Sequence, residues 1–492
     1  MSTHFPAFMI VLPLVAAPVC VLLRRGLWSR VLATLVAWAC FGFALAIWIQ
    51  VGDQGTIRYE LGGWASPYGI EYRIDAFNAY VACIVSLMAA VVLPFGAGTH
   101  SPSVPLERQS KYYAAFLLCI CGLLGIVITG DLFNVFVFLE ISSLSAYTLI
   151  ALGKGRRALR AAFSYLVMGT VGGTFFLLGV GLLYQVTGTL NMLDLTQRLE
   201  GVLDSRTVVV ATGFLTVGTG IKLAVFPLHQ WLPNAYTYAP SKVSAFLAST
   251  ATKVSFYVLA RNLFGVLGAS YVFGTLHLER VLLPLSLLAM FVGSMAAIYQ
   301  TNIKRLLAYS SIAQIGYMTL GLSMANESGL TGSVAHLFNH ALMKGGLFLV
   351  VASVSFRIGS VAIDDWRGLG RRMPWTSAAF VVAGLGLIGV PGTVGFVSKW
   401  FLVLGALANG WYLVAWLILL SSMLAVVYVW RVVEVLYMQE APEGARPLDE
   451  APWTMRGPTW LLVAATVFFG IYTTPTVGAA QAAVAALLGG SP

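Results

Sequence analysis

The hydrophobic residues of this chain form long continuous runs that are separated by short polar stretches. A helix needs about 20 apolar residues to cross the hydrocarbon core of a bilayer. The runs also lack the alternation with a period of two that marks the strands of a membrane β-barrel. We therefore predict a single all-α polytopic membrane domain over residues 1–492. Its predicted membrane-spanning helices number about fourteen, at residues 7–23, 31–50, 77–98, 112–129, 132–152, 161–185, 207–230, 241–267, 281–299, 304–324, 332–356, 374–406, 411–437 and 457–477.

Two blocks of five predicted helices can be set side by side, at residues 112–267 and 281–437. The fourth helix of each block is long and interrupted, by Pro227 in GIKLAVFPLHQWLP and by Pro391 and Gly392 in GLIGVPGTVGFVSKW. Because each block has an odd number of helices, the second block must start on the opposite face of the membrane, so the blocks are predicted to be inverted repeats. Broken helices at matching positions of such repeats indicate an ion or substrate site near the bilayer midplane, although proline kinks are also common in membrane helices.

The remaining segments lie outside these repeats. Residues 1–111 contain the first three predicted helices, and residues 457–492 contain the last one. The segment 51–75 is rich in turn residues, and we predict a short hairpin-like loop there, outside the membrane.

Composition and charge agree with a membrane protein. The chain is 59% hydrophobic and 10% charged, whereas a typical soluble domain is about 25% charged. Its net charge of +10 comes from Lys and Arg scattered over short loops, so we expect no nucleic acid partner. The basic residues concentrate in loops after odd-numbered helices, such as RRGLWSR (24–30) and KGRRALR (154–160), and loops of this kind face the cytoplasm. We therefore expect a bacterial inner (plasma) membrane, with both termini on the non-cytoplasmic side.

The sequence offers no site for a cofactor or a metal ion. The five cysteines all fall in predicted helices, without metal-ligand spacing. The chain also lacks a phosphate-binding loop, a GxGxxG motif after a strand, and haem or iron–sulfur spacing. We therefore expect the energy for any transport to come from an ion gradient or from partner subunits.

Five charged residues interrupt the apolar helices: Glu140, Lys222, Lys253, Lys344 and Lys399. Each mid-membrane charge costs about 2.5–3.5 kcal/mol on insertion scales, so five would cost roughly 12–17 kcal/mol. A structural role could justify one or two paired charges, and Lys399 lies close enough to a helix end to extend toward the headgroups. Five charges spread over five helices instead indicate an ion or proton pathway.

A buried carboxylate suits such a pathway when a lysine lies beside it. Glu140 is the single charged residue between Leu132 and Gly153. Desolvation disfavours the charged form of a lysine, and a nearby carboxylate restores it. A Glu–Lys pair whose separation or hydration changes is therefore a protonation switch. The residues alone leave open which lysine pairs with Glu140.

The segment HLFNHALMKGG places His336, His340 and Lys344 at four-residue spacing, which aligns them on one helix face. Neutral imidazoles both accept and donate protons near physiological pH, so we interpret these residues as part of a proton relay. The alternative is that the histidines are structural and satisfied by neighbours. A zinc site is disfavoured, because Leu337 occupies the position where the zinc-protease pattern has glutamate.

Two further residues could belong to an access path. His229 follows the helix break at Pro227, and Asp131 precedes the helix of Glu140. For His229, a plain structural role is an equally good interpretation. No dense cluster of oxygen ligands lies within the predicted helices beyond Asp131, Glu140 and the polar residues near them. We therefore expect protons to move through this chain, and we assign any Na⁺ or K⁺ path to a partner.

Several of these phrases resemble the antiporter-type subunit superfamily. GDLFNVFVFLE is similar to its fifth-helix motif, KLAVFPLHQWLPNAY and PSKVSAFLASTATKVSFYVL to its seventh and eighth helices, HLFNHALMKGGLF to its eleventh, and PGTVGFVSKWFLVL to its twelfth. The superfamily includes subunits of Mrp-type multisubunit cation/proton antiporters, the antiporter-like subunits of respiratory complex I, and relatives in membrane-bound hydrogenases. The resemblance spans essentially the whole chain and implies fourteen helices with two inverted five-helix repeats.

The resemblance also implies roles for individual residues. Glu140 would pair with Lys222 on the broken seventh helix, and Lys253 would be the central lysine. Lys399 would be the terminal group of the broken twelfth helix, and the eleventh-helix histidines match His336 and His340. Together these residues would conduct protons from one half of the chain to the other.

Within the superfamily, the phrase GDLFNVFVFLEI looks most like the D-type component of the Mrp antiporter. We therefore expect a proton-translocating, non-enzymatic subunit of a multisubunit Na⁺(K⁺)/H⁺ antiporter, with partner subunits of the A, B, C, E, F and G types. The alternative is a proton-pumping subunit of a complex I-type NADH dehydrogenase or a membrane-bound hydrogenase. A coupling partner for another proton-driven process and an inactive scaffold are further alternatives, and the intact set of buried charges argues against the scaffold.

Overall fold

The structure is a computed structural model that describes residues 2–97, 104–442 and 448–489. It is almost entirely helical. The α-helices are α1 (Phe5–Leu22), α2 (Gly26–Gln54), α3 (Ala76–Val92), α4 (Gln109–Ile128), α5 (Leu132–Ala151), α6 (Arg156–Thr187), α7 (Met192–Leu199), α8 (Arg206–Leu223), α9 (Trp231–Tyr238), α10 (Ser241–Ala260), α11 (Glu279–Ile298), α12 (Ile303–Met324), α13 (Glu327–Ile358), α14 (Leu369–Arg372), α15 (Pro374–Ile388), α16 (Val394–Ala408), α17 (Tyr412–Tyr437), α18 (Trp453–Ile471) and α19 (Thr474–Leu487).

Short elements connect the long helices. Two π-helical segments, η4 (Arg261–Val266) and η5 (Ser270–Thr275), follow α10. The 3₁₀ turns are η1 (Ser2–His4), η2 (Leu61–Gly63), η3 (Leu106–Arg108) and η6 (Ile363–Trp366). Strands β1 (Ile57–Glu60) and β2 (Glu71–Ile74) pair antiparallel, with Ile57 opposite Ile74. The predicted hairpin is therefore present, but it starts later than predicted because α2 continues to Gln54.

The all-α polytopic prediction is confirmed. Every predicted membrane-spanning segment coincides with a helix or with a pair of helices separated by a break. Among the described residues, ten helical spans are long and apolar enough to cross a membrane, and α3, α15 and α16 are shorter apolar helices. The sequence reasoning ended the seventh segment at residue 230 and did not predict α9, which continues it beyond the break.

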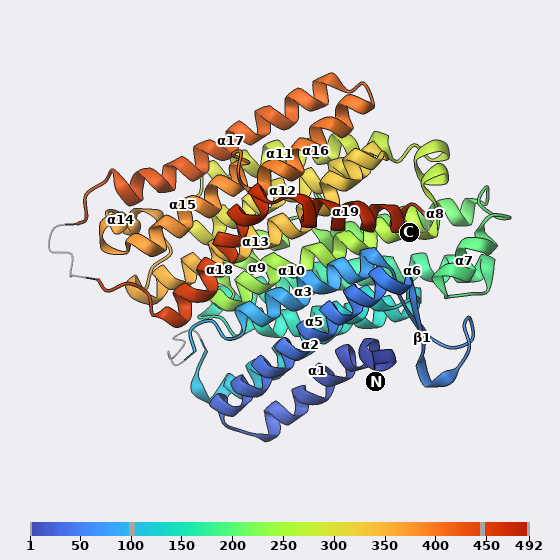
Figure 1. The fold of residues 1–492 in the computed structure, drawn as a ribbon, viewed down its shortest axis with the longest axis horizontal. Coiled ribbons are helices and arrows are strands. Elements are labelled where there is room, and N and C mark those ends of the chain that lie inside the picture. Colours follow the sequence, from blue (N-terminus) through green and yellow to red (C-terminus); the bar gives the residue numbers. More distant parts are fainter. Residues whose placement is uncertain (1, 98–103, 443–447, 490–492) are drawn as a thin grey trace.

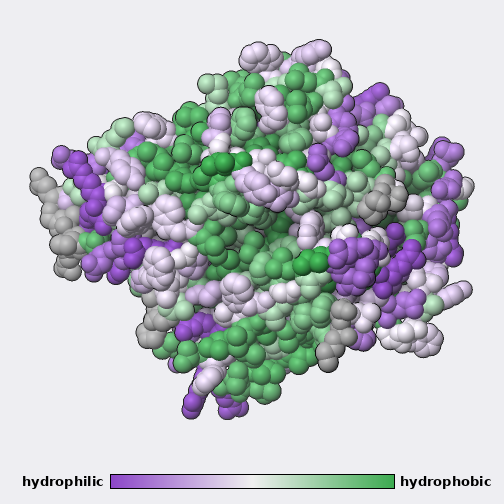
Figure 2. Space-filling view, viewed as in Figure 1, coloured by the Kyte–Doolittle hydropathy of each residue, from purple (hydrophilic) through white to green (hydrophobic). Residues whose placement is uncertain are grey.

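The helices form one bundle with polar ends and an apolar middle. In Figure 1 the α14 region lies at one end of the bundle, whereas β1, α7 and both chain termini lie toward the other. Figure 2 shows hydrophobic residues over the middle of the same face and hydrophilic residues gathered at the two ends. Exposed Leu, Val and Trp side chains on α1, α2, α6 and α17 contribute to the apolar surface. A surface of this kind is suited to lipid rather than to water.

Helix α13 lies in the core of the bundle. It packs against α10, α12, α15, α16, α18 and α19, and its residues from Gly329 to Val354 are buried, except for the partly buried Phe338. Asn326 caps its first turn by accepting a hydrogen bond from the N–H of Gly329 at 2.8 Å. A helix that is buried all round has no solvated face for its polar residues. His336, His340 and Lys344 are therefore inside the protein.

An ion pair joins α3 to the far end of the α10 span. Asp75 caps α3 with a capping box, and Arg261 donates to its carboxylate at 2.8 Å. Burial favours a raised pKa for Asp75, but the Arg261 guanidinium and the N–H groups of Phe77 and Asn78 hold that pKa below its usual value. This contact fixes the start of α3 against the segment that follows α10.

Helices α6 and α8 approach closely because glycines face each other. A Cβ added at Gly218 would lie 2.6 Å from the backbone nitrogen of Phe176 and 2.7 Å from the carbonyl oxygen of Gly172. Gly218→Ala should therefore push the helices apart and lower the free energy of unfolding by about 1–3 kcal/mol. Thermal unfolding of the full chain in one detergent measures this loss. Gly213→Ala on the same helix is the matched control, because its Cβ would meet nothing within 4 Å; equal melting temperatures for the two variants would contradict the argument.

Candidate functional site

Both broken helices end at a break where the carbonyl groups of the last turn need hydrogen-bond donors. Helix α8 ends at Leu223, its C-cap residue Ala224 has a left-handed φ of +63°, and Pro227 lies between α8 and α9. Helix α15 ends at Ile388, its C-cap residue Gly389 has a φ of +88°, and Pro391 and Gly392 lie before α16. The last carbonyls of a helix have no partner within that helix and carry the negative end of its dipole. At the first break the carbonyls of Gly220 and Ile221 accept hydrogen bonds from the N–H groups of Val225 and Ala224. At the second break the carbonyls of Leu387 and Ile388 accept them from a buried lysine.

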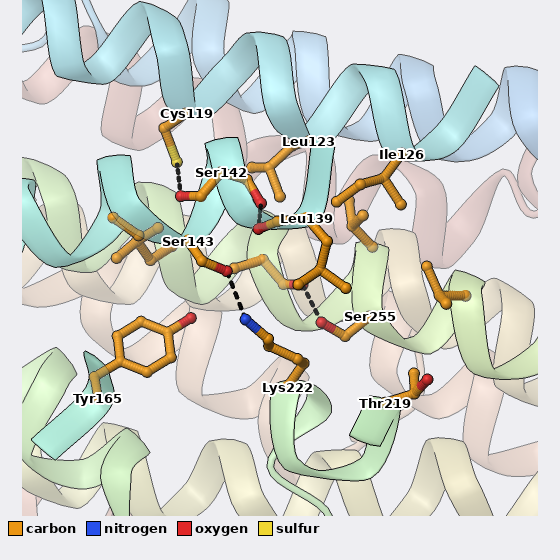
Figure 3. Close-up of a pocket in the computed structure, with 15 residues that line it drawn as sticks. Cys119, Leu123, Ile126, Leu139, Ser142, Ser143, Tyr165, Thr219, Lys222 and Ser255 are labelled. Carbon is orange, nitrogen blue, oxygen red and sulfur yellow. Dashed lines mark hydrogen bonds between the residues drawn. The ribbon is translucent and has the colours of Figure 1, made fainter. Parts of the chain in front are cut away.

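The first break holds a lysine beside a carboxylate. Lys222, in the last turn of α8, donates to the hydroxyl of Ser143 at 2.8 Å, and its Nζ lies 3.5 Å from Oε1 of Glu140. Figure 3 shows the side chains of Ser143 and Lys222 pointing toward each other. The side chain of Lys222 is 5% exposed and that of Glu140 is 28% exposed. The lysine that faces Glu140, which the residues alone left open, is therefore Lys222.

A small cavity lies beside Lys222 (Figure 3). Its volume is about 30 Å³, which is enough for about two water molecules. Polar side chains reach it from α5, α8 and α10: Ser142, Ser143, Thr219, Lys222 and Ser255. The cavity thus lies between Lys222 and α10, the helix that carries Lys253, although Lys253 itself does not line it.

Lys253 lies at the centre of the protein with no accessible surface. Its ammonium donates to the backbone carbonyl of Ala248 and lies 3.5 Å from the hydroxyl of Thr252. Among the described residues, no carboxylate lies within ion-pair distance of Lys253. Of the four lysines in the apolar helices, Lys222 alone has a carboxylate partner in this described part of the chain. Lys253 therefore depends on neutral oxygen atoms for its hydrogen bonds.

The α13 residues lie next to Lys253. His336 donates through Nε2 to Oε1 of Gln314 on α12 at 2.9 Å, and its Nδ1 lies 2.8 Å from the hydroxyl of Ser398 on α16. The rings of His336 and His340 are stacked with their centres 5.7 Å apart. Both ring nitrogens of His340 lack a protein partner in the described part of the chain, so they are free to accept or donate a proton. Lys253 and Lys344 both interact electrostatically with His340.

Lys344 and Lys399 continue this row of buried groups. Lys344 donates to the backbone carbonyl of Leu307 at 2.8 Å and to the hydroxyl of Ser310. Lys399, on α16, donates to the carbonyls of Leu387 and Ile388 at 3.0 and 2.9 Å. These carbonyls are the ones that the second helix break exposes. The ammonium of Lys399 also lies 4.7 Å from the centre of the Tyr317 ring, a distance at which the ring face attracts a cation.

The two residues suggested for an access path have local contacts. Asp131 caps α5 by accepting a hydrogen bond from the N–H of Asn134 at 2.7 Å, and burial raises the pKa of its carboxyl. His229 lies in the break between α8 and α9 and is half-buried, with its ring stacked on Phe226 at 5.2 Å. The structure brings neither residue into hydrogen-bond contact with the Glu140–Lys222 pair.

Sequence reasoning missed the neutral partners of the buried cations. These partners are Gln314, Ser310, Tyr317 and Ser398, in addition to the exposed carbonyls. The signal in the sequence was the polar content of α12, where Ser310, Ser311 and Gln314 interrupt an apolar run. In the described residues, no group of three or more His, Cys, Asp or Glu side chains is placed to hold a metal ion.

Comparisons with known proteins agree with this architecture. Residues 129–425 match the family described as NADH:quinone oxidoreductase/Mrp antiporter, TM. The chain is 43% identical to the N-type component of the NADH-quinone oxidoreductase of Desulforudis audaxviator over 467 residues, which are 92% of this chain and 90% of that protein. It is 29% identical to the D-type component of the Na⁺/H⁺ antiporter of Bacillus subtilis, over 96% of this chain and 94% of the relative.

A solved structure shows the same fold. A chain in the structure of the Mrp complex from Dietzia sp. superposes with a TM-score of 0.89 at 23% identity, covering 99% of this chain and 97% of that one. The family match extends over more than half of the 492 residues and includes the helices of Glu140, Lys222, Lys253, His336 and Lys399. The chain therefore belongs to the NADH:quinone oxidoreductase/Mrp antiporter transmembrane family, as an antiporter-like membrane subunit.

Proposed function

We propose that this chain translocates protons through the row of buried ionisable groups. The observation that carries the proposal is the Lys222–Glu140 contact, at 3.5 Å inside the bundle, with Ser143 as the second partner of the amine. When the carboxylate is close, it favours the ammonium form, and when the two groups separate, the desolvated amine releases its proton. The small cavity beside Lys222 would pass that proton to Lys253.

The path then continues through the second half of the chain. Lys253 and Lys344 lie near enough to His340 to interact with its charge, and Lys399 does the same with His336. A proton would pass from Lys253 and Lys344 to His340, and then through His336 to Lys399, which the carbonyls of the second break hold. His229 and Asp131 would contribute at most to access from the membrane surface. No step needs a metal ion or a cofactor.

The proposed inverted repeats support a proton path that runs from one half of the chain to the other. We propose that residues 112–267 and 281–437 are inverted repeats, because each contains one broken helix with a buried lysine. Lys222 lies in the last turn before the break of its helix, whereas Lys399 lies in the second turn after the break of its own. Inverted placement of the two lysines would open the two ends of the path to opposite sides of the membrane.

We further propose that the path couples protons to Na⁺ or K⁺ in a multisubunit antiporter of the bacterial plasma membrane. The B. subtilis relative is the D-type component of an antiporter, and 96% of this chain aligns with it. Partner subunits of the A, B, C, E, F and G types would provide the cation path, and a neighbour beside α5 would complete the burial of Glu140. The Lys/Arg-rich end, which includes α14, would face the cytoplasm, and the termini would lie on the other side.

A second candidate is a proton-pumping subunit of a redox enzyme. The observation that favours it is the 43% identity to the N-type component of an NADH-quinone oxidoreductase. In that case, electron transfer in soluble partner subunits would drive protons along the same path.

Transport by the intact complex separates the two candidates. Inverted membrane vesicles that contain the complex are given a pH gradient, and Na⁺ or K⁺ is added without an electron donor. An antiporter should dissipate the gradient on cation addition, with Lys253→Met vesicles as the inactive control. Proton pumping that needs an electron donor and ignores both cations would contradict antiport and support the redox candidate.

A further inference from the structure

A second, larger cavity opens at the Lys/Arg-rich end of the bundle. Its volume is about 650 Å³, and its walls come from the ends of α4, α10, α12, α13 and α18 and from the loops beside them. None of the groups assigned to the proton path lines it. It therefore calls for an explanation of its own.

The charges that line this cavity all have the same sign. Lys154, Lys242, Lys304 and Arg357 line it, and its described lining residues include no acidic side chain. Lys304 is 5% exposed, and its ammonium donates to the carbonyl of Ala239 at 2.9 Å, which leaves two of its three donors free. Lys242 has no hydrogen-bond or ion-pair partner among the described residues. Confined cations without a counter-ion are costly, so the cavity is suited to an anion.

The backbone adds donors to the same place. Pro240, Ser241 and Lys242 line the cavity. Pro240 is the N-cap residue of α10, Ser241 and Lys242 begin the helix, and its first turn has no side-chain cap. The N–H groups of an uncapped first turn, together with the positive end of the helix dipole, favour phosphate oxygens. Lysine and arginine donate charge-assisted hydrogen bonds to the same oxygens.

The remaining walls are apolar, with Phe95, Tyr112, Phe356 and Met455 among them. These side chains could contact glycerol and the beginning of acyl chains. Basic pockets between membrane helices on the cytoplasmic side bind anionic lipid headgroups in this way. A set of cations would, by contrast, repel incoming protons, so the cavity is poorly suited to collect them.

We propose that this cavity binds a phosphate group, which the headgroup of an anionic phospholipid supplies. Lys242, Lys304 and the first turn of α10 hold the phosphate oxygens, and Lys154 and Arg357 neutralise the rest of the charge. A bound lipid would join the ends of the two five-helix blocks, because α10 belongs to the first block and α12 and α13 belong to the second.

Native mass spectrometry of the full chain in neutral detergent tests the proposal, with phosphatidylglycerol as the probe and phosphatidylcholine as the neutral comparison. Lys242→Gln removes a cation without changing the length of the side chain greatly, and it should weaken phosphatidylglycerol binding about tenfold. Lys111→Gln is the matched control, since Lys111 is an exposed lysine at the same end of the bundle but outside the cavity. It should bind like the wild type.

Inorganic phosphate, added as a competitor, identifies the source of the anion. Partial displacement of the lipid by millimolar phosphate in the wild type, but not in Lys242→Gln, would support a phosphate site. Phosphate that binds while phosphatidylglycerol does not would overturn the lipid source. Equal binding of the two lipids, or an equal loss in both lysine variants, would overturn the site itself.

Discussion

Replacing Lys253 with methionine should abolish cation- or redox-driven proton transport while the protein still folds. The amine is fully buried in the middle of the proposed path, on the helix that also lines the cavity beside Lys222, and it interacts electrostatically with His340. Methionine has a similar length but carries no proton. Loss of a positioned proton carrier costs about 10²–10⁴-fold in rate, so we expect at least a 100-fold drop in the initial rate of transport by reconstituted complex.

Stability measurements separate this effect from misfolding. Replacing a buried charge with an apolar side chain of similar volume is often neutral or stabilising, and Lys253 has no carboxylate partner whose charge would be left behind. The melting temperature of the Lys253→Met protein should therefore stay within a few degrees of that of the wild type. Thr250→Val is the matched control, because it removes a fully buried polar group from the same helix, and the Thr250 hydroxyl only donates to the carbonyl of Phe246. Transport that persists in Lys253→Met would show that the central lysine is structural.

The sequence was sufficient for most of the fold because burial in lipid leaves a coarse signal. Continuous apolar runs of about 20 residues predict helices without any knowledge of tertiary contacts, and proline or glycine within such a run predicts where it breaks. Helix α9 was missed because its eight residues, WLPNAYTY, are too short and too polar to resemble a span. Helix α19 has an Ala-rich sequence, and its packing against α3 and α13 depends on the tertiary fold.

The candidate site was only partly predictable, because its partners come from different helices. Charged residues stand out in an apolar run, so Glu140, Lys253 and Lys344 were evident. The pairing of Glu140 with Lys222 depends on the relative positions of α5 and α8, which no local pattern encodes; the family resemblance supplied it. The hydroxyl partners of the buried lysines were still harder to predict from the sequence. Ser143 contacts Lys222, whereas Ser145, two residues later, only returns a hydrogen bond to the carbonyl of Ile141, as helical serines commonly do.

The two members of the Glu140–Lys222 pair should lose transport together rather than independently. Glu140→Gln keeps a hydrogen-bonding side chain of the same shape but can no longer favour the ammonium form of Lys222. Lys222→Met removes the amine itself. If the two groups act as one switch, each single variant should lower the rate of transport at least about tenfold, and the double variant should be no slower than the slower single variant. Glu327→Gln, at the start of α13, is the matched control and should transport like the wild type.

The size of the coupling distinguishes a switch from two separate functions. The amine is 2.8 Å from the Ser143 hydroxyl and 3.5 Å from the carboxylate, so the hydroxyl holds Lys222 in place while the carboxylate acts mainly through its charge. When Lys222 is present, removing the carboxylate charge of Glu140 therefore changes when the amine carries a proton. When Lys222 is already replaced by methionine, removing the carboxylate charge changes nothing further. Rate losses that multiply in the double variant would mean that Glu140 and Lys222 serve different steps, and the proton would then have to enter this half of the chain by a route that does not depend on their contact.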